Sequence, residues 1–70
     1  MTKLREIRLA QGLTQFELAK RSNVYPADIS KIEAGIVRPY EKWRKALALA
    51  LNVPEEALFP EVAKNANKAK

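Results

Sequence analysis

The sequence predicts an all-α fold, a compact bundle of five helices built around a central helix pair. Apolar residues recur at helical spacing along the chain, and no segment alternates as a β-strand would. Glycine, asparagine and proline separate the helical segments at short intervals. The chain has only 70 residues, which is enough for one small domain. We place this domain at residues 1–60 and expect a polar, basic tail at residues 61–70, frayed or weakly helical.

The first predicted helix spans residues 2–11. Thr2 is its candidate N-cap, because a threonine hydroxyl can accept a backbone N–H of the first turn. Gly12 follows the helix, where glycine readily adopts the left-handed conformation that ends many helices. The side chains expected to form the apolar stripe are Leu4, Ile7, Leu9 and Ala10.

The second predicted helix begins at Thr14-Gln15-Phe16-Glu17, which has the pattern of a capping box. The Thr14 hydroxyl can accept the backbone N–H of Glu17, while the Glu17 carboxylate accepts that of Thr14. Asn23 ends this helix, because asparagine is second only to glycine in tolerating a left-handed turn. Ala19 faces inward, and its small side chain sets how closely the second and third helices approach.

The third predicted helix spans residues 26–34 and ends at Gly35. Pro26 suits the first helical position, where its missing N–H costs nothing, and Asp28 favours the positive end of the helix dipole. The inward face is formed by Ile29 and Ile32, and the outward face by Ala27, Ser30 and Lys31. Residues 15–35 are thus two short helices joined by a tight turn. We interpret them as a helix-turn-helix whose second helix enters the major groove of DNA.

Two more helices are predicted after a short link at residues 36–39. The fourth covers residues 40–51, and the fifth is a short cap at residues 54–59. We interpret Tyr40 and Trp43 as packing residues rather than as platforms on which bases stack. The apolar residues at helical spacing in the fourth helix are Trp43, Ala46, Leu47, Ala50 and Leu51.

The composition excludes several classes of function. The chain contains no cysteine and no histidine, which removes disulfides, thiolate–zinc sites, cysteine nucleophiles and histidine general bases. Its carboxylates are dispersed, and no phosphate loop or metal-ligand spacing is present. We therefore predict no enzyme, no metal and no other cofactor. No apolar run approaches the roughly 20 residues that span a bilayer, and no signal peptide opens the chain. We expect a cytoplasmic protein that does not bind membranes.

The charge balance favours a polyanionic partner. The chain has 13 Lys and Arg residues against 8 Asp and Glu residues, a net charge of +5. Three of the lysines (Lys64, Lys68 and Lys70) lie in the tail, where a solvated surface explains them. The folded part is basic in its own right, because the sequence through Asn52 contains 10 basic and 5 acidic residues.

These residues resemble a known family: the helix-turn-helix domain of lambda-type phage repressors and Cro, including the xenobiotic-response-element regulators of bacteria. The matching segments are Leu4-Arg5-Glu6-Ile7-Arg8, Gly12-Leu13-Thr14-Gln15, Glu17-Leu18-Ala19, Ile29-Ser30-Lys31-Ile32-Glu33, Gly35, Pro39, Leu47-Ala48-Leu49-Ala50-Leu51-Asn52-Val53 and Leu58-Phe59. The resemblance covers about residues 3 to 59. A lone helix-turn-helix segment would be a weak signal, whereas the flanking helices in register make the pattern specific. It implies a lambda-repressor-like bundle.

The resemblance also implies roles for individual positions. Gln15, at the start of the second helix, matches a residue that binds a DNA phosphate and buttresses the recognition helix. Arg8 and Glu33 match a pair that forms a structural salt bridge between the first and third helices. The positions implied to contact bases are occupied by Tyr25, Pro26, Ala27, Ser30 and Lys31.

The base-contacting positions depart from the usual family pattern. They often hold Ser, Gln, Arg or Thr, yet Pro26 has no side-chain donor and Ala27 can touch only a thymine methyl. Hydrogen-bonding readout is therefore left to Tyr25, Ser30 and Lys31. A contact from Lys31 to guanine is the most specific one available.

Several apolar residues stand where the family commonly has polar ones. Ile36 and Val37 lie in the link, and they are either satellites of the core or part of a dimer interface. Phe16, in the second helix, raises the same question. Because so small a monomer has limited surface for a specific DNA site, we predict a homodimer. It is expected to form through Leu58, Phe59 and the start of the tail, with help from Ile36 and Val37.

The favoured function is sequence-specific binding of double-stranded DNA by a homodimer that acts as a repressor-like transcriptional regulator. Phosphate contacts are expected from Gln15, Arg38 and Lys42 together with helix N-terminal amides. The alternative is a protein-interaction module of the same fold, of the antitoxin or anti-repressor type. The apolar segments Tyr25-Pro26-Ala27 and Ile36-Val37 favour this alternative, whereas the net charge and Gln15 favour DNA.

Overall fold

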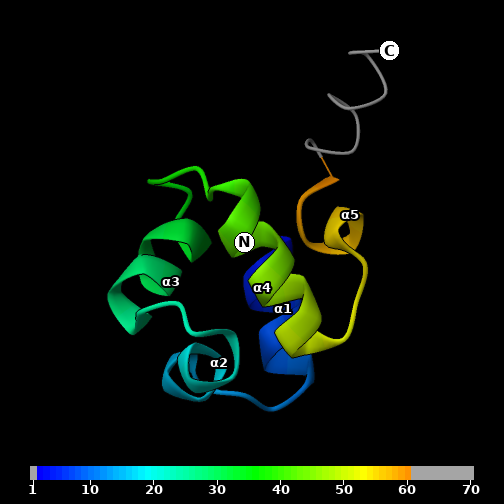
Figure 1. Ribbon diagram of the computed structural model, residues 1–70. Helices are drawn as coiled ribbons and strands as arrows, with labels where there is room; N and C mark the ends of the chain where they lie inside the picture. The colour runs from blue at the N-terminus through cyan, green and yellow to red at the C-terminus, as the bar shows by residue number, and fades with distance from the viewer. Residues whose placement is uncertain (1, 61–70) are drawn as a thin grey trace.

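The computed structural model describes residues 2–60, and these residues form five α-helices and no strand (Figure 1). The helices are α1 (Lys3–Ala10), α2 (Gln15–Ser22), α3 (Pro26–Glu33), α4 (Glu41–Leu51) and α5 (Glu55–Leu58). The predicted all-α, five-helix fold is confirmed. The predicted tail at residues 61–70 lies outside the described residues. Within residues 2–60, no helix is long and apolar enough to cross a membrane.

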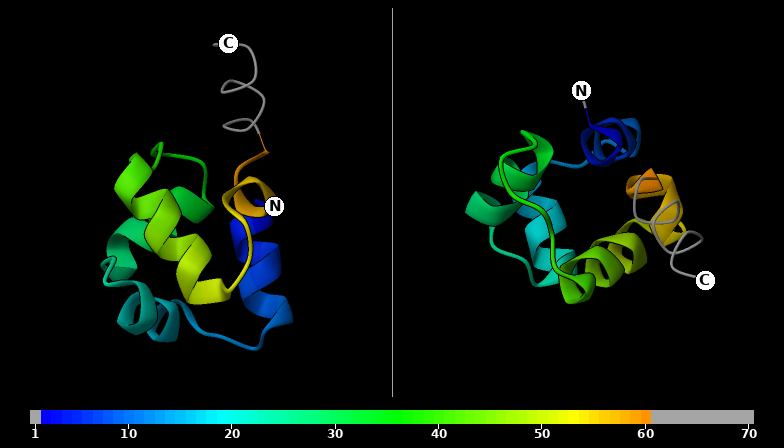
Figure 2. Two further views of the ribbon diagram at one scale, coloured as in Figure 1. Left: turned by 45° about the vertical axis from the view of Figure 1, so that its right-hand side comes forward. Right: turned by 90° about the horizontal axis from the view of Figure 1, so that it is seen from above.

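The helices surround a shared interior (Figure 2). Helix α4 packs against α2 and α5, and α2 also packs against α3, while α1 packs against α5. Helix α3 therefore lies at the periphery of the molecule, with α2 beside it (Figure 1). This arrangement leaves one side of α3 free of the rest of the chain.

The N-termini of α1 and α2 are capped by threonine side chains, as predicted. Thr2 Oγ1 accepts the backbone N–H of Arg5 at 3.4 Å. At α2, Thr14 Oγ1 accepts the Glu17 N–H at 3.0 Å, and Glu17 Oε1 accepts the Thr14 N–H at 2.9 Å, which completes a capping box. The Thr14 backbone N–H, and after it the Thr14 hydroxyl, hold the pKa of the Glu17 carboxyl below its ordinary value, because both stabilise the charged carboxylate.

Left-handed residues end the helices at the positions that the sequence indicates. Asn23 has φ 66° and closes α2, so the chain turns directly into α3. Gly35 has φ 78° and follows the end of α3. Asn52, with φ 58°, ends α4 in the same way. Asparagine tolerates this region because its short polar side chain can hydrogen-bond locally.

The hydrophobic core draws one or two fully buried side chains from each of the four longer helices. These residues are Leu4 of α1, Leu18 of α2, Ile29 of α3, and Leu47 and Leu51 of α4. Leu58 and Phe59 close the core from the end of the described chain. Burial of these apolar side chains is the main favourable contribution to folding in a domain of this size.

The predicted inward stripe of α1 is wrong in one part. Leu9 and Ala10 are exposed rather than part of the inward stripe of α1. Arg8 instead shares the buried face with Leu4, because residues four apart lie on the same side of a helix. Tyr40 is exposed, and its ring packs against that of Trp43 with 4.9 Å between centroids, which agrees with the expected packing role of the two residues.

Candidate nucleic-acid interface

The outward side of α3 is accessible along its whole length. Ile29 and Ile32 are buried against the core, so the residues between them face away from it. The outward-facing residues Ala27, Ser30 and Lys31 are all exposed, and Pro26 at the first helical position is half-buried. Tyr25, which directly precedes the helix, is 77% exposed. The five residues expected to contact bases thus lie on or at the start of one accessible helix face.

Helix α3 is held from behind by a buried ion pair between Arg8 and Glu33. The Arg8 guanidinium donates from Nε to Glu33 Oε2 at 2.6 Å and from Nη2 to Oε1 at 3.0 Å. Its third nitrogen, Nη1, donates to the backbone carbonyl of Leu13 at 2.7 Å. Both charged residues are buried, with 6% of Arg8 and 7% of Glu33 exposed. The pair therefore fixes the end of α3 against the end of α1 and the loop that follows it.

Gln15 extends this ion pair to the start of α2. Its Nε2 donates to Glu33 Oε1 at 3.0 Å, and the Gln15 side chain is half-buried. Glu33, the last residue of α3, thus accepts hydrogen bonds from a residue of α1 and a residue of α2. The contact orients the Gln15 amide at the position where the family resemblance implies a phosphate contact.

Thr2 supplies a bond to α3 that the sequence reasoning missed. The same hydroxyl that caps α1 donates to the backbone carbonyl of Glu33 at 3.1 Å. Helix C-termini leave carbonyl groups without intrahelical partners, so this bond satisfies one of them. No local sequence signal could have indicated it, because the two residues are 31 positions apart.

Arg38 and Lys42 are exposed near the link between α3 and α4. Within residues 2–60, no acidic side chain lies at ion-pair distance from Arg38, Lys42 or Lys31. Arg44, by contrast, donates from Nε to Glu55 Oε2 at 2.7 Å and from Nη1 to the Pro39 carbonyl at 3.0 Å. It is therefore a structural residue that joins α4, α5 and the link.

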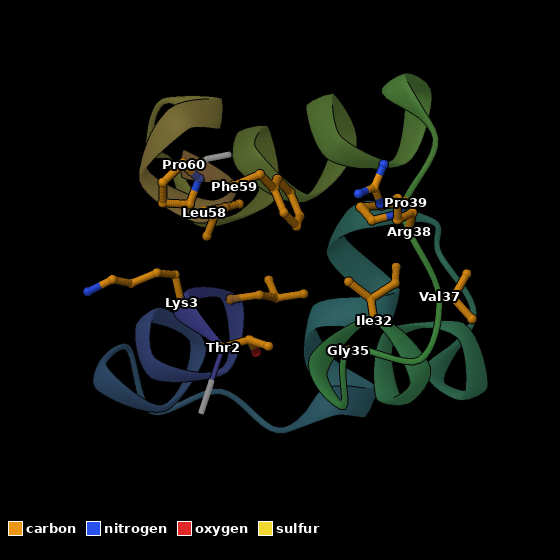
Figure 3. A pocket seen from close by; sticks show the side chains of 11 residues that line it. Thr2, Lys3, Ile32, Gly35, Val37, Arg38, Pro39, Leu58, Phe59 and Pro60 are labelled. Carbon is orange, nitrogen blue, oxygen red and sulfur yellow. The ribbon is translucent and has the colours of Figure 1, made fainter. Parts of the chain in front are cut away.

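A hollow of about 380 Å³ lies between the start of α1, the link and the end of α5. Figure 3 shows Phe59 and Ile32 reaching into it from opposite sides, with Val37 and Arg38 on the link. Leu58 and Phe59 are only 3% and 6% exposed. The prediction that these two residues form a dimer surface is therefore corrected, because they bury their apolar area in the core of their own chain.

Ile36 and Val37 remain accessible in the link. Ile36 is 74% exposed, so the interpretation as a core satellite is wrong for this residue. Val37 is 37% exposed and also lines the hollow. The two side chains together form an apolar surface beside the C-terminal end of α3.

Two helices joined by a left-handed asparagine, the second accessible and braced from behind, define a helix-turn-helix protein. The chain matches the model of a family described as a helix-turn-helix domain over residues 2–59, and it belongs to that family. The match spans all five helices and agrees with the resemblance to lambda-repressor and Cro-like domains. No curated protein and no solved structure is significantly similar to the chain. The fold class is a DNA-binding one, found in transcription regulators.

Proposed function

We propose that this protein binds a specific double-stranded DNA site as a homodimer and acts as a repressor-like transcriptional regulator. In each protomer, α3 would enter the major groove with its exposed side toward the bases. The observation that carries the proposal is the contrast between the two sides of α3. The side bearing Ser30 and Lys31 is free, whereas Glu33 is locked to α1 and α2 on the other.

Phosphate contacts would position the domain on the duplex. Gln15 contacts the last residue of α3 through its hydrogen bond to Glu33, Arg38 lies in the link that follows α3, and Lys42 lies in the first turn of α4. The two cations are exposed, with no acidic side chain at ion-pair distance in residues 2–60. Neutralised phosphates release counterions, which makes binding fall steeply with salt. About three phosphates per protomer would give a dimer a slope of about −5 in log affinity against log salt concentration. A slope near zero would contradict DNA binding.

Few side chains of α3 would be able to read bases through hydrogen bonds. Lys31 is the best candidate for a contact with the acceptor atoms of guanine, and Ser30 can pair with either donors or acceptors. Both side chains are exposed. Ala27 can contribute only an apolar contact.

The decisive experiment is a selection of binding sites from random duplexes, followed by affinity measurements on variants. Lys31→Ala should weaken binding to the selected site by about 1–3 kcal/mol and relax the base preference at one position of each half-site. Lys45→Ala is the matched control, because Lys45 is a lysine of α4 that pairs with Glu41 at 2.9 Å. Unchanged selectivity in Lys31→Ala and Ser30→Ala would overturn the assignment of α3 as the recognition helix.

The second candidate is a protein-interaction module of the antitoxin or anti-repressor type. The exposed apolar residues Tyr25 and Ile36, at the two ends of α3, favour it. The same measurements discriminate the two functions. A protein-binding module would show no selected DNA site, and Lys31→Ala would leave its weak duplex binding unchanged.

A further inference from the structure

A second hollow, of about 180 Å³, lies at the junction of α2, the turn and the start of α3. Phe16, Lys20 and Asn23 line it from one side of α2, as residues at this spacing share a helix face. Tyr25 and Pro26 line it from the start of α3, and Ala19 and Val24 complete the wall. The hollow is therefore part of the helix-turn-helix itself and directly adjoins the exposed side of α3.

Two large aromatic side chains border this hollow without being buried by the fold. Phe16 is 64% exposed and Tyr25 is 77% exposed. One exposed aromatic residue on a protein surface is ordinary, but two that line the same hollow form a local apolar site. Neither side chain contributes to the core, so the fold itself does not account for them.

The edge of the hollow is cationic. Lys20 Nζ lies 5.9 Å from the centroid of the Phe16 ring, at a distance where an ammonium group interacts favourably with the ring. Within residues 2–60, Lys20 has no acidic side chain at ion-pair distance. A ligand that suits this hollow carries a small apolar group next to a negative charge.

DNA offers such a combination in its major groove. The only apolar group that standard bases present there is the C5-methyl of thymine, and 5-methylcytosine carries the same group. Phosphates lie along the edge of the groove, within reach of a lysine that flanks the recognition helix. Pro26 and Ala27, at the positions implied to contact bases, have no side-chain hydrogen-bond donor or acceptor and so leave apolar contact as the available readout.

We propose that the hollow between Phe16 and Tyr25 receives the C5-methyl of a pyrimidine, while Lys20 contacts the neighbouring phosphate. This inference rests on the proposed insertion of α3 into the major groove, and it makes Phe16 a specificity-determining residue outside the recognition helix. One base pair in each half-site is then selected by its methyl group rather than by hydrogen bonds.

The test replaces thymine by deoxyuridine, one position at a time, in the duplex obtained by selection. This change removes the methyl and keeps every hydrogen-bonding group of the base. Affinity should fall about fourfold at one position per half-site, the effect expected when one methyl group is no longer withdrawn from water. In a second arm, the T·A pair at that position is replaced by C·G with and without the cytosine C5-methyl, and the methylated duplex should bind more tightly.

Variants identify the residues that sense the methyl. Phe16→Ala and Tyr25→Ala should bind the thymine and deoxyuridine duplexes with equal affinity. Tyr40→Ala is the matched control, since Tyr40 is also an exposed tyrosine but does not line this hollow, and it should keep the preference for thymine. Thermal unfolding of each variant checks that the exposed aromatic residues can be removed without loss of the fold.

Two failures can be told apart. A wild-type protein that binds its selected duplex but treats thymine and deoxyuridine alike at every position overturns the methyl site and leaves the proposed function intact. A methyl preference that persists in both Phe16→Ala and Tyr25→Ala also overturns the site. A wild-type protein that selects no duplex overturns the proposed function and the methyl site together.

Discussion

The Arg8 guanidinium and the Glu33 carboxylate form two parallel hydrogen bonds, of 2.6 and 3.0 Å, across the junction of α1 and α3. Side by side, these bonds fix the relative orientation of the two planar groups as well as their distance. Glu33 also accepts a hydrogen bond from Gln15. The position of α3 therefore depends on one buried charge cluster, in addition to apolar packing.

Removal of one partner from this cluster should strongly destabilise the fold. Arg8→Ala or Glu33→Ala leaves an uncompensated charge in the interior, and the free energy of unfolding should fall by about 3–5 kcal/mol. The double variant Arg8→Met/Glu33→Leu should recover much of the loss, since an apolar pair leaves no buried charge. Urea unfolding measures the free energy of unfolding of each variant. Lys45→Ala is the control and should have little effect, because it breaks an exposed ion pair. Additive losses in the double variant would contradict this account.

Gln15 should act on DNA affinity without changing base preference. Gln15→Ala removes the proposed phosphate contact and one hydrogen bond to Glu33, so affinity should fall by a similar factor for all duplexes. Gln15→Glu should be worse, because it places a second carboxylate next to that of Glu33. Fluorescence anisotropy on the selected duplex and on single-base variants of it measures both effects. A change of preference at one base pair would instead assign Gln15 a role in readout.

The capping box should make stability depend on pH in the acidic range. The folded-state pKa of Glu17 lies below its ordinary value, so its contribution is complete above the unfolded-state pKa and disappears as the pH falls through the folded-state pKa. The difference in thermal stability between the wild type and Glu17→Ala should therefore be largest near neutral pH and vanish at strongly acidic pH. A difference that stays constant down to acidic pH would show that the charged carboxylate is not the stabilising form.

The turn between α2 and α3 should tolerate glycine and reject branched side chains. At φ 66°, Asn23→Gly keeps the left-handed conformation accessible, whereas Asn23→Val should destabilise by about 1–2 kcal/mol or more. Arg21→Val, at an exposed helical position of α2, is the control and should stay within about 0.5 kcal/mol of the wild type. Thermal unfolding compares the three variants. Equal losses for both valine variants would contradict a conformational role for Asn23.

The apolar surface of the link should support dimerisation. Ile36→Ser removes the most exposed part of that surface, and we expect it to weaken self-association and lower the affinity for a palindromic duplex. Binding to an isolated half-site should change little, because Ile36 is not among the proposed DNA contacts. Sedimentation over a range of concentrations and binding to both duplexes measure these effects. A wild-type protein that stays monomeric and still binds one palindrome tightly would contradict the homodimer.

Local features of this fold were predictable from the sequence because local chemistry determines them. The capping box at Thr14 and the left-handed Asn23 each depend on residues within a few positions, so their helix boundaries follow from pattern alone. The exposed side of α3 was predictable for the same reason, since Ile29 and Ile32 fix which side faces the core.

Features that depend on distant parts of the chain were not predictable. The spacing of Leu9 made it a plausible core residue, but the buried face of α1 is occupied by Arg8, whose partner lies 25 residues away. Phe59 was assigned to a dimer surface because nothing in the sequence indicates how α5 folds against the core. The hollow lined by Phe16 was likewise not predictable, because it forms only when the turn after α2 places Tyr25 beside that helix.

The hydroxyl of Thr2 links the start of α1 to the last residue of α3, because it accepts the Arg5 N–H and donates to the Glu33 carbonyl. Replacing Thr2 by valine would therefore leave the backbone carbonyl of Glu33 without this hydrogen-bond partner. Under the proposed function, a residue that is not among the proposed DNA contacts would thus influence how α3 is held against a duplex.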